Sequence, residues 1–335
     1  MKILVIRFSS LGDVVLISPL FQKIKHLYPD ARLTFLTDIR FVRLFKTDPN
    51  IDRIMPYDVS CENLMYLILF LKKVRKERYD IIIDCHIIPR SLFFLLFCRA
   101  VKRLRLKKFS LKRRRMVKLH NRKKIPHIVD RYLATIEEKD TNDYKPRIYL
   151  NKNEISKFGY LLKQKKKGRK IMGFAPDASK KTKVWQLQKL RNLALTLTEN
   201  DNVYIVFFGE KNEIPFVRKI KEGLNDTYLD LTGKTDVREL ALFLEGCDVL
   251  FTTDSGPMHI AVAVGTPVVS IFGPTVPEFG FAPYDKRSVI ISKPLHCRPC
   301  SLHGTDTCSL GHHKCMELIE VEEVRKAIKR LLAVE

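Results

Sequence analysis

The sequence predicts an α/β protein made of two Rossmann-like domains, each built on a parallel sheet. Short apolar runs rich in β-branched residues alternate with segments of helical periodicity along the chain, which is the pattern of βαβ units. The run YDIIIDCH (79–86) is almost continuously apolar, as expected for a strand that is buried on both faces. The chain has 335 residues, 45% of them hydrophobic, which suffices for two cores of about 150 residues each.

Strands separated by helices are expected throughout the first half of the chain. The strands are expected at 2–8, 32–37, 52–56 and 80–85, and the helices at 14–27, 39–46, 62–77 and 90–101. A further helical segment, 127–138, precedes the domain junction, which we place near 145–168. This gives an N-terminal domain of residues 1–150 and a C-terminal domain of residues 151–335.

The second half repeats the same alternation. Strands are expected at 170–176, 202–209, 228–233, 248–254 and 267–273, and helices at 185–199, 213–224, 236–247, 257–265 and 321–334. Strands joined by helical crossovers pair in parallel. We therefore expect two parallel sheets whose domains face each other across a cleft.

The chain is strongly basic, with 61 Lys and Arg against 37 Asp and Glu and a formal net charge of +24. A soluble enzyme of small neutral substrates rarely needs such an excess, so an anionic partner is expected: nucleic acid, an acidic membrane surface or a phosphorylated substrate. The excess is greatest in residues 99–124, the basic belt, which contain fourteen Lys or Arg and no Asp or Glu.

No apolar run is long enough to span a membrane, which takes about 18 residues. The longest runs are LMYLILFL (64–71) and SLFFLLFC (91–98). Arg7 and Asp13 interrupt the apolar N-terminus, so we expect no signal peptide. The expected location is the cytoplasm, peripheral at the inner membrane, where the scattered cysteines are core thiols: Cys61, Cys85, Cys98 and Cys247.

Two strand–turn–helix junctions contain polar residues. The first, FSSLGDVVLISPL (8–20), lacks the G-x-G-x-x-G spacing of a dinucleotide site and has a carboxylate, Asp13, where a phosphate would be repelled. The second, DVLFTTDSGPMHIAVAVG (248–265), directs a helix N-terminus at a potential anion. An ordinary capped junction, with Asp254 or Ser255 as N-cap, explains the second fragment equally well, and His259 by itself is more typical of a packed or capping histidine.

Both junctions closely resemble signature motifs of the ADP-heptose:lipopolysaccharide heptosyltransferases, glycosyltransferase family 9. The matching strings are ILVIRFSSLGDVVLISPLFQKIKHLYPDARLTFLT near the N-terminus and TDSGPMHIAVAVGTPVVSIFGPT near the C-terminus. The resemblance covers essentially the whole chain. It implies a GT-B fold, with the acceptor on the N-terminal domain and the nucleotide sugar mainly on the C-terminal one.

The resemblance assigns Asp13 as the general base that takes the proton of the acceptor hydroxyl, with inversion at the anomeric carbon. The alternative is that Asp13 merely caps helix 14–27. Gly12 keeps the approach to Asp13 open. The expected acceptor-binding residues are Ser10, Gly12, Arg113, Arg114 and Arg115.

For the donor, the resemblance maps a diphosphate-binding lysine onto Lys183, two positions before Trp185, helped by Thr182 or Ser179. Lys180 and Lys181 remain alternatives. The remaining expected donor-binding residues are Glu210 (or Glu213) for the ribose, Asp254 for the sugar hydroxyls, and Ser255, Gly256 and His259 around the helix N-terminus. An acidic first helical turn explains Glu210 and Glu213 equally well.

The chain departs from the family pattern twice in this loop. Gln186 stands where many relatives have a proline, and Asp177 where many have a glycine. An acidic residue beside a phosphate loop is unfavourable unless it faces away or contacts the ribose, so the loop contacts of Asp177 are left open.

The basic belt has three interpretations. It is a solvated surface, a surface that faces the phosphates and carboxylates of lipopolysaccharide on an anionic membrane, or an RNA-binding surface. Its place in the expected acceptor domain, directly after SLFFLLFC, favours the second. SLFFLLFC itself is more typical of a core helix than of a membrane anchor.

Four cysteines gather in CRPCSLHGTDTCSLGHHKC (297–315), namely Cys297, Cys300, Cys308 and Cys315. Their spacing suits a closed structural site for zinc or iron, with His303, His312 and His313 as alternative ligands. Reduced thiols that pack a loop, or a labile disulfide, are the alternative.

The sequence thus favours an inverting heptosyltransferase of the lipopolysaccharide inner core that uses an ADP-heptose donor and needs no cofactor for catalysis. Two alternatives remain: a GT-B transferase of another nucleotide sugar, and a basic RNA- or membrane-surface-binding protein on a degenerate scaffold. Retention of Asp13, Lys183 and Asp254 argues against the last.

Overall fold

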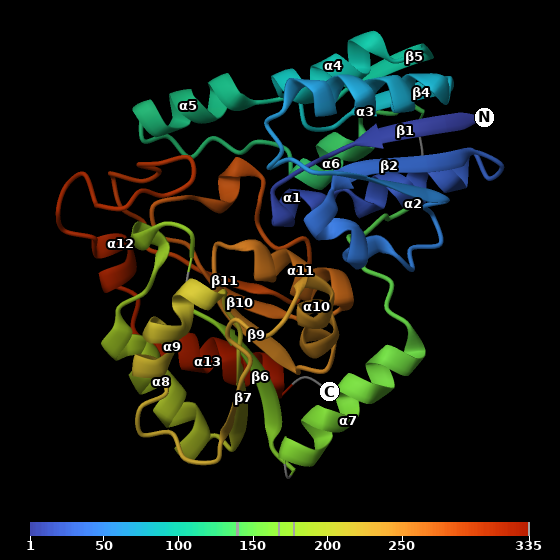
Figure 1. Ribbon diagram of the computed structural model, residues 1–335. Coiled ribbons are helices and arrows are strands. Elements are labelled where there is room, and N and C mark those ends of the chain that lie inside the picture. Colours follow the sequence, from blue (N-terminus) through green and yellow to red (C-terminus); the bar gives the residue numbers. More distant parts are fainter. Residues whose placement is uncertain (139–140, 167, 177, 334–335) are drawn as a thin grey trace. The chain divides into compact units, whose positions relative to one another are not determined.

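The computed structural model describes residues 1–138, 141–166, 168–176 and 178–333. They form two compact α/β units (Figure 1). Unit 1 contains residues 1–108 and 126–149, and unit 2 contains residues 109–125 and 150–335. The α/β class with parallel sheets predicted from the sequence is confirmed.

Unit 1 is built on a parallel sheet of five strands in the order β3-β2-β1-β4-β5. The strands are β1 (Lys2–Ile6), β2 (Arg32–Asp38), β3 (Arg53–Tyr57), β4 (Tyr79–Asp84) and β5 (Ala100–Arg105). The helices are α1 (Leu11–Leu16), α2 (Ser18–Leu27), α3 (Leu64–Lys76), α4 (Pro89–Phe97) and α6 (Ile128–Leu133), with the 3-10 segment η1 (Ile39–Phe45). β1 is fully buried after its first residue because it lies in the middle of the sheet with helices on both faces.

Two local features of unit 1 differ from the sequence-based expectation. The helix expected at 14–27 is divided into α1 and α2, because Pro19 cannot donate the helical hydrogen bond and instead stands in the first turn of a new helix. The helix expected at 90–101 ends at Phe97, and β5 follows as an edge strand. Arg103 of β5 donates to the carbonyl oxygens of Leu95 (2.8 Å) and Cys98 (2.9 Å), which stabilises the end of α4.

Unit 2 is built on a parallel sheet of six strands in the order β11-β10-β9-β6-β7-β8. The strands are β6 (Lys170–Ala175), β7 (Val203–Phe207), β8 (Tyr228–Asp230), β9 (Val249–Thr253), β10 (Val268–Ile271) and β11 (Val289–Ile291). The helices are α5 (Ser110–Lys118), α7 (Lys152–Lys166), α8 (Leu187–Asn200), α9 (Ile214–Ile220), α10 (Val237–Glu245), α11 (Gly256–Val264), α12 (Lys314–Glu317) and α13 (Val321–Leu332), with the 3-10 segments η2 (Lys181–Lys183), η3 (Lys211–Glu213) and η4 (Pro277–Phe279).

One continuous apolar core supports unit 2. Helices α8, α9 and α13 pack their apolar faces against the side chains of β6, β7, β9 and β10. Helices α10 and α11 lie together on the other face of the sheet (Figure 1). On that face Gly173 of β6 leaves room for Leu250, Phe208 and Leu244, which would stand 3.1–3.2 Å from a Cβ at this position.

Segment 109–125 belongs to unit 2. The division expected from the sequence, with domains of 1–150 and 151–335, places this segment in the first domain. Met116 and Ile125 of this segment are buried against Val276 and Phe279. Arg122 forms an ion pair with Glu278 at 2.9 Å. The segment is rich in charge, so its few apolar contacts with residues far along the chain leave little local signal in the sequence.

Trp185 supports the loop that follows β6. The indole is 1% exposed and packs against Phe251 at a ring-centroid distance of 6.1 Å. Its Nε1 has no hydrogen-bond partner among the described residues, so the side chain contributes by packing alone.

We therefore expect Trp185→Ala to lower the free energy of unfolding of unit 2 by about 3–5 kcal/mol, because a large buried side chain is lost and a cavity is left. Trp185→Phe is expected to cost only about 1–2 kcal/mol, because no hydrogen bond is lost. Urea unfolding followed by circular dichroism measures both. A Trp185→Phe variant as unstable as Trp185→Ala would contradict a packing role.

Candidate functional site

Each sheet has a point where the strand order reverses. In unit 1 the reversal lies between β1 and β4, and in unit 2 between β6 and β9. In open parallel sheets, ligands bind outside the carboxyl ends of the strands at such points, because the connecting helices leave toward opposite faces and open a crevice. The segments that follow β1, β6 and β9 contain Asp13, Lys183 and Asp254, three of the functional residues expected from the sequence.

At the switch point of unit 1, Asp13 forms an ion pair with Arg7. The Arg7 Nη2 lies 2.6 Å from Asp13 Oδ2, and both side chains are largely buried, at 9% and 17% exposure. The same oxygen accepts a hydrogen bond from Ser10 Oγ at 3.0 Å. The Tyr132 hydroxyl lies 3.4 Å from Asp13 Oδ1.

Arg7 is in turn held by the loop that follows β4, because its Nη1 donates to the Cys85 carbonyl oxygen at 2.7 Å. Burial by itself works to lower the pKa of Arg7, but the charge of Asp13 overcomes it, and the pKa is raised. The guanidinium therefore joins the loops after β1 and β4 and fixes the Asp13 carboxylate between them.

Asp13 does not cap a helix here. It lies in the first turn of α1, where Ser10 occupies the N-cap position. Asp13 is therefore not the N-cap residue of this helix, and its role as general base stays a prediction. Ser10 is exposed and bonded to Asp13, and Gly12 is buried in the same turn.

His86 also lies at this switch point, although it belongs to none of the motifs in the sequence. It lies two residues after the end of β4, and its ring packs edge-on against Phe8 at 5.7 Å. The pKa of His86 is lowered to about 3, first because burial penalises the charged ring and then because Arg7 repels it. The signal that could have found it is its position at the carboxyl end of the strand beside β1.

At the switch point of unit 2, Lys183 joins the loops after β6 and β9. Its Nζ lies 2.7 Å from Asp254 Oδ2 and donates to the Asp254 carbonyl oxygen at 2.8 Å. Thr275, after β10, donates to the same carboxylate at 2.7 Å. An ammonium group has three protons, so Lys183 can also donate to a ligand oxygen while it keeps both contacts with Asp254.

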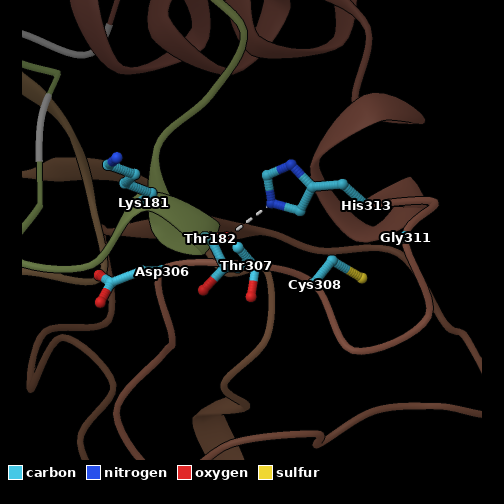
Figure 2. A pocket seen from close by; sticks show the side chains of 7 residues that line it. All are labelled: Lys181, Thr182, Asp306, Thr307, Cys308, Gly311 and His313. Carbon is cyan, nitrogen blue, oxygen red and sulfur yellow. Dashed lines mark hydrogen bonds between the residues drawn. The ribbon is translucent and has the colours of Figure 1, made fainter.

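Thr182 is bonded to a distant loop, and its expected contact with a donor stays a prediction. It is 4% exposed, and its hydroxyl donates to the Thr305 carbonyl oxygen at 2.7 Å and accepts from the Thr305 amide at 2.8 Å. The His313 ring bonds the Thr182 carbonyl oxygen at 2.8 Å. Figure 2 shows this ring directed at Thr182, beside a cavity of about 340 Å³ that is lined by Lys181, Thr182, Asp306, Thr307, Cys308, Gly311 and His313.

The loop after β9 presents the start of α11. Ser255 is the N-cap residue, but within the described residues its side chain makes no cap hydrogen bond and instead bonds Thr252 at 3.0 Å. Gly256 follows as the first helical residue. His259 is 6% exposed on α11, as expected of a packed histidine, and its expected contact with the donor stays a prediction.

The loop after β7 contains both acidic candidates for the ribose. Glu210 is exposed before η3. The carboxylate of Glu213 lies over Gly209, where an added Cβ would stand 2.3 Å from its Oε2. Gly209 thus allows Glu213 to approach the strand end. Asp177 lies outside the described residues.

Helix α5 contains the three arginines expected to bind the acceptor. Arg113 is partly buried and stacks over the Phe281 ring at 5.3 Å, whereas Arg114 and Arg115 are exposed. The helix packs in unit 2. The expectation that these residues belong to the N-terminal domain is therefore wrong, although their role toward an acceptor stays a prediction.

The four clustered cysteines are free thiols, and they lie near one another. Burial raises the pKa of Cys315 to about 11, and neighbouring thiols add to the effect. Across residues 1–138, 141–166, 168–176 and 178–333, no group of three His, Cys, Asp or Glu residues is arranged to hold a metal ion. A structural zinc or iron ion at this cluster stays a prediction.

Within the part of the chain that the structure describes, no helix combines the length and hydropathy needed to cross a membrane.

Two parallel-sheet units with polar residues at both switch points are typical of glycosyltransferases with the GT-B fold. Two solved structures of glycosyltransferases have a similar fold. A family 9 glycosyltransferase from Veillonella parvula matches with a TM-score of 0.82 at 23% identity, covering 100% of this chain and 97% of that chain. ADP-heptose lps heptosyltransferase II of E. coli matches with a TM-score of 0.79 at 22% identity, covering 99% and 98%.

The sequence comparisons narrow this class to one family. The model of glycosyltransferase family 9 (heptosyltransferase) matches residues 68–310. Lipooligosaccharide heptosyltransferase 2 of Campylobacter jejuni is 28% identical over 341 residues, which cover 99% of this chain and 98% of that protein. The chain belongs to glycosyltransferase family 9 and is a glycosyltransferase.

The lowered pKa of His86 makes the stability of unit 1 depend on pH. The unfolded chain binds a proton on this ring near its ordinary pKa, whereas the folded chain does not, so stability falls as the pH falls below that value. Between about pH 7 and about pH 5, we expect the chain to lose about 2 kcal/mol more of its unfolding free energy than a His86→Gln variant loses. Urea unfolding at both pH values tests this, and equal losses would contradict a neutral buried ring.

Proposed function

We propose that this chain transfers heptose from ADP-L-glycero-D-manno-heptose to the inner core of lipopolysaccharide, onto Kdo or heptose, with inversion at the anomeric carbon. The observation that carries the proposal is the Asp13 carboxylate, fixed by Arg7 at the first switch point of a family 9 chain. The relatives' names supply the sugar and the class of acceptor, since one is a lipooligosaccharide heptosyltransferase and another an ADP-heptose enzyme.

In the proposed mechanism Asp13 is the general base. An acceptor hydroxyl is a weak nucleophile until its proton is removed, and a carboxylate within hydrogen-bond reach removes it as the new bond forms. Arg7 and Ser10 both contact Oδ2, and Tyr132 contacts Oδ1. These contacts fix the orientation of the carboxylate, which takes the proton.

Inversion follows from attack opposite to the leaving group. The acceptor oxygen bonds to the anomeric carbon while the bond from that carbon to the diphosphate of ADP breaks. The leaving diphosphate gains negative charge, which a lysine and a helix N-terminus stabilise. Lys183 and the first amides of α11 provide these groups after β6 and β9. Asp254 positions the Lys183 ammonium and is the expected partner of the sugar hydroxyls.

Replacing Asp13 tests the base directly. We expect Asp13→Asn to lower kcat by about 100-fold to 10,000-fold, because general-base catalysis is lost, with ADP affinity nearly unchanged. Ser10→Ala is the matched control. It removes a hydrogen bond to the Asp13 carboxylate but keeps the carboxylate itself, so its kcat is expected to fall less than about tenfold. The assay is ADP release with ADP-heptose and a Kdo-terminated lipid A acceptor.

An Asp13→Asn variant with nearly full turnover would refute the role of Asp13. Absence of turnover in the unmodified chain, with both this acceptor and a heptosylated one, would refute the proposed donor or acceptor.

Replacing Lys183 tests the donor site. Lys183→Met is expected to weaken ADP binding by about 10-fold to 100-fold, because a charged hydrogen bond to the diphosphate is lost. Lys181→Met, two positions away on the exposed side of η2, removes the same charge and is expected to weaken binding much less. Isothermal titration with ADP measures both, and a larger loss in Lys181→Met would move the assignment to that residue.

A further inference from the structure

Helices α3 and α4 of unit 1 lie side by side on one face of the sheet. Their inner side chains are in the core, where the rings of Phe70 and Phe94 meet edge to face at 5.9 Å. Their outer side chains are apolar as well, which is unusual for helices that cover only one sheet. The exposed apolar residues of the two helices are Leu64, Met65, Ile68, Leu69, Phe93, Leu96 and Phe97.

These residues form one surface, which we call the apolar face. On α3 they occupy the outward side of the first two turns, and on α4 they occur at spacings of three and four, so each set forms a stripe. Phe93 and Phe97 stack at 5.8 Å. Val101 of β5, 87% exposed, adds to the face, because Arg103 on the same side of that strand contacts the end of α4.

The concentration of apolar side chains here exceeds that of the remaining surface. Eight of the seventeen exposed large apolar side chains among the described residues lie between Leu64 and Val101. Scattered apolar residues on a protein surface need no explanation, but a contiguous group marks a surface that another apolar phase covers.

Basic residues predominate among the charges around the apolar face, and the acidic residues that flank α3 are Glu62 and Glu77, the second of which is paired with Arg53. The last two turns of α3 contain Lys72, Lys73, Arg75 and Lys76, and α3 contains no acidic residue. Residues 89–105 likewise include no Asp or Glu, and Arg99 and Arg105 follow α4 as exposed residues. The occupant of this face therefore has to be apolar in its interior and negatively charged at its surface.

An anionic lipid bilayer has both properties. Leucine and phenylalanine side chains enter the boundary between headgroups and acyl chains, while lysine and arginine extend their long stems to the phosphates. A second copy of this chain fits poorly, because two faces bordered by positive charge, on chains of net charge +24, repel each other.

We propose that the outer surface of α3 and α4, with Val101, is a membrane-docking face that binds the surface of an anionic phospholipid bilayer without crossing it. This assignment moves the contact from the basic belt, whose segment 109–125 packs in unit 2, to two helices of unit 1. It rests on the surface of unit 1 alone and holds whatever sugar the enzyme transfers.

Vesicle flotation with the full chain tests the proposal. The chain is expected to float with vesicles of phosphatidylglycerol and phosphatidylethanolamine, to bind phosphatidylcholine vesicles weakly, and to detach as salt is raised. Leu69→Glu combined with Leu96→Glu is expected to lower the partition coefficient at least about tenfold, because two exposed apolar side chains become charged.

The matched control replaces Leu161 and Leu310 with glutamate. These leucines are 43% and 61% exposed, against 58% and 63% for Leu69 and Leu96, so the two variants differ in position but not in charge. Circular dichroism and ADP binding confirm that both variants are folded. ADP release with a soluble, delipidated acceptor is expected to be equal in all three proteins, which separates membrane docking from the transfer reaction.

Three results would overturn the proposal. One is that the unmodified chain fails to float with anionic vesicles. Another is that the control variant loses as much binding as the Leu69 and Leu96 variant, which would assign the effect to net charge. The third is a lipid-free dimer in sedimentation that the Leu69 and Leu96 substitutions convert to a monomer, which would assign the face to a second copy.

Discussion

The reversal of strand order in each sheet is the constraint on which the functional geometry depends. A parallel sheet places the carboxyl ends of all its strands at one edge, and the helices that follow two neighbouring strands leave toward opposite faces where the order reverses. In unit 1, the loops after β1 and β4 therefore lie next to each other with no helix between them. The same holds in unit 2 for the loops after β6 and β9. A single cationic side chain can then join each pair of loops.

In both units a cationic side chain joins the two loops. In unit 1, Arg7 spans from the carbonyl oxygen of Cys85 to the carboxylate of Asp13. In unit 2, Lys183 spans from the loop after β6 to both the carbonyl oxygen and the carboxylate of Asp254. Partly buried ion pairs of this kind are costly to desolvate and give little stability, but they fix the orientation of a carboxylate. Such orientation is useful in a site where a proton or a sugar must be positioned.

The large positive charge is distributed between two different environments. Part of the basic belt forms α5, where Arg113 stacks on Phe281 and Arg122 pairs with Glu278, so these charges contribute to packing within unit 2. The lysines of α3 and the arginines after α4 instead border exposed apolar side chains of unit 1. Basic side chains thus take part in packing within unit 2 and in a proposed membrane contact of unit 1.

The sequence by itself determined the α/β class, the parallel sheets and the family, and it singled out Asp13, Lys183 and Asp254 as candidates, because apolar periodicity and local motifs are properties of neighbouring residues. Tertiary structure alone decided which residues meet. Arg7 pairs with Asp13, Thr182 is hydrogen-bonded to Thr305, and segment 109–125 packs with unit 2. In each case the fold, and not the position in the chain, brings the partners together. The apolar runs in α3 and α4 show the same limit: local hydrophobicity predicts that a helix is apolar, but only packing decides which of its side chains are buried.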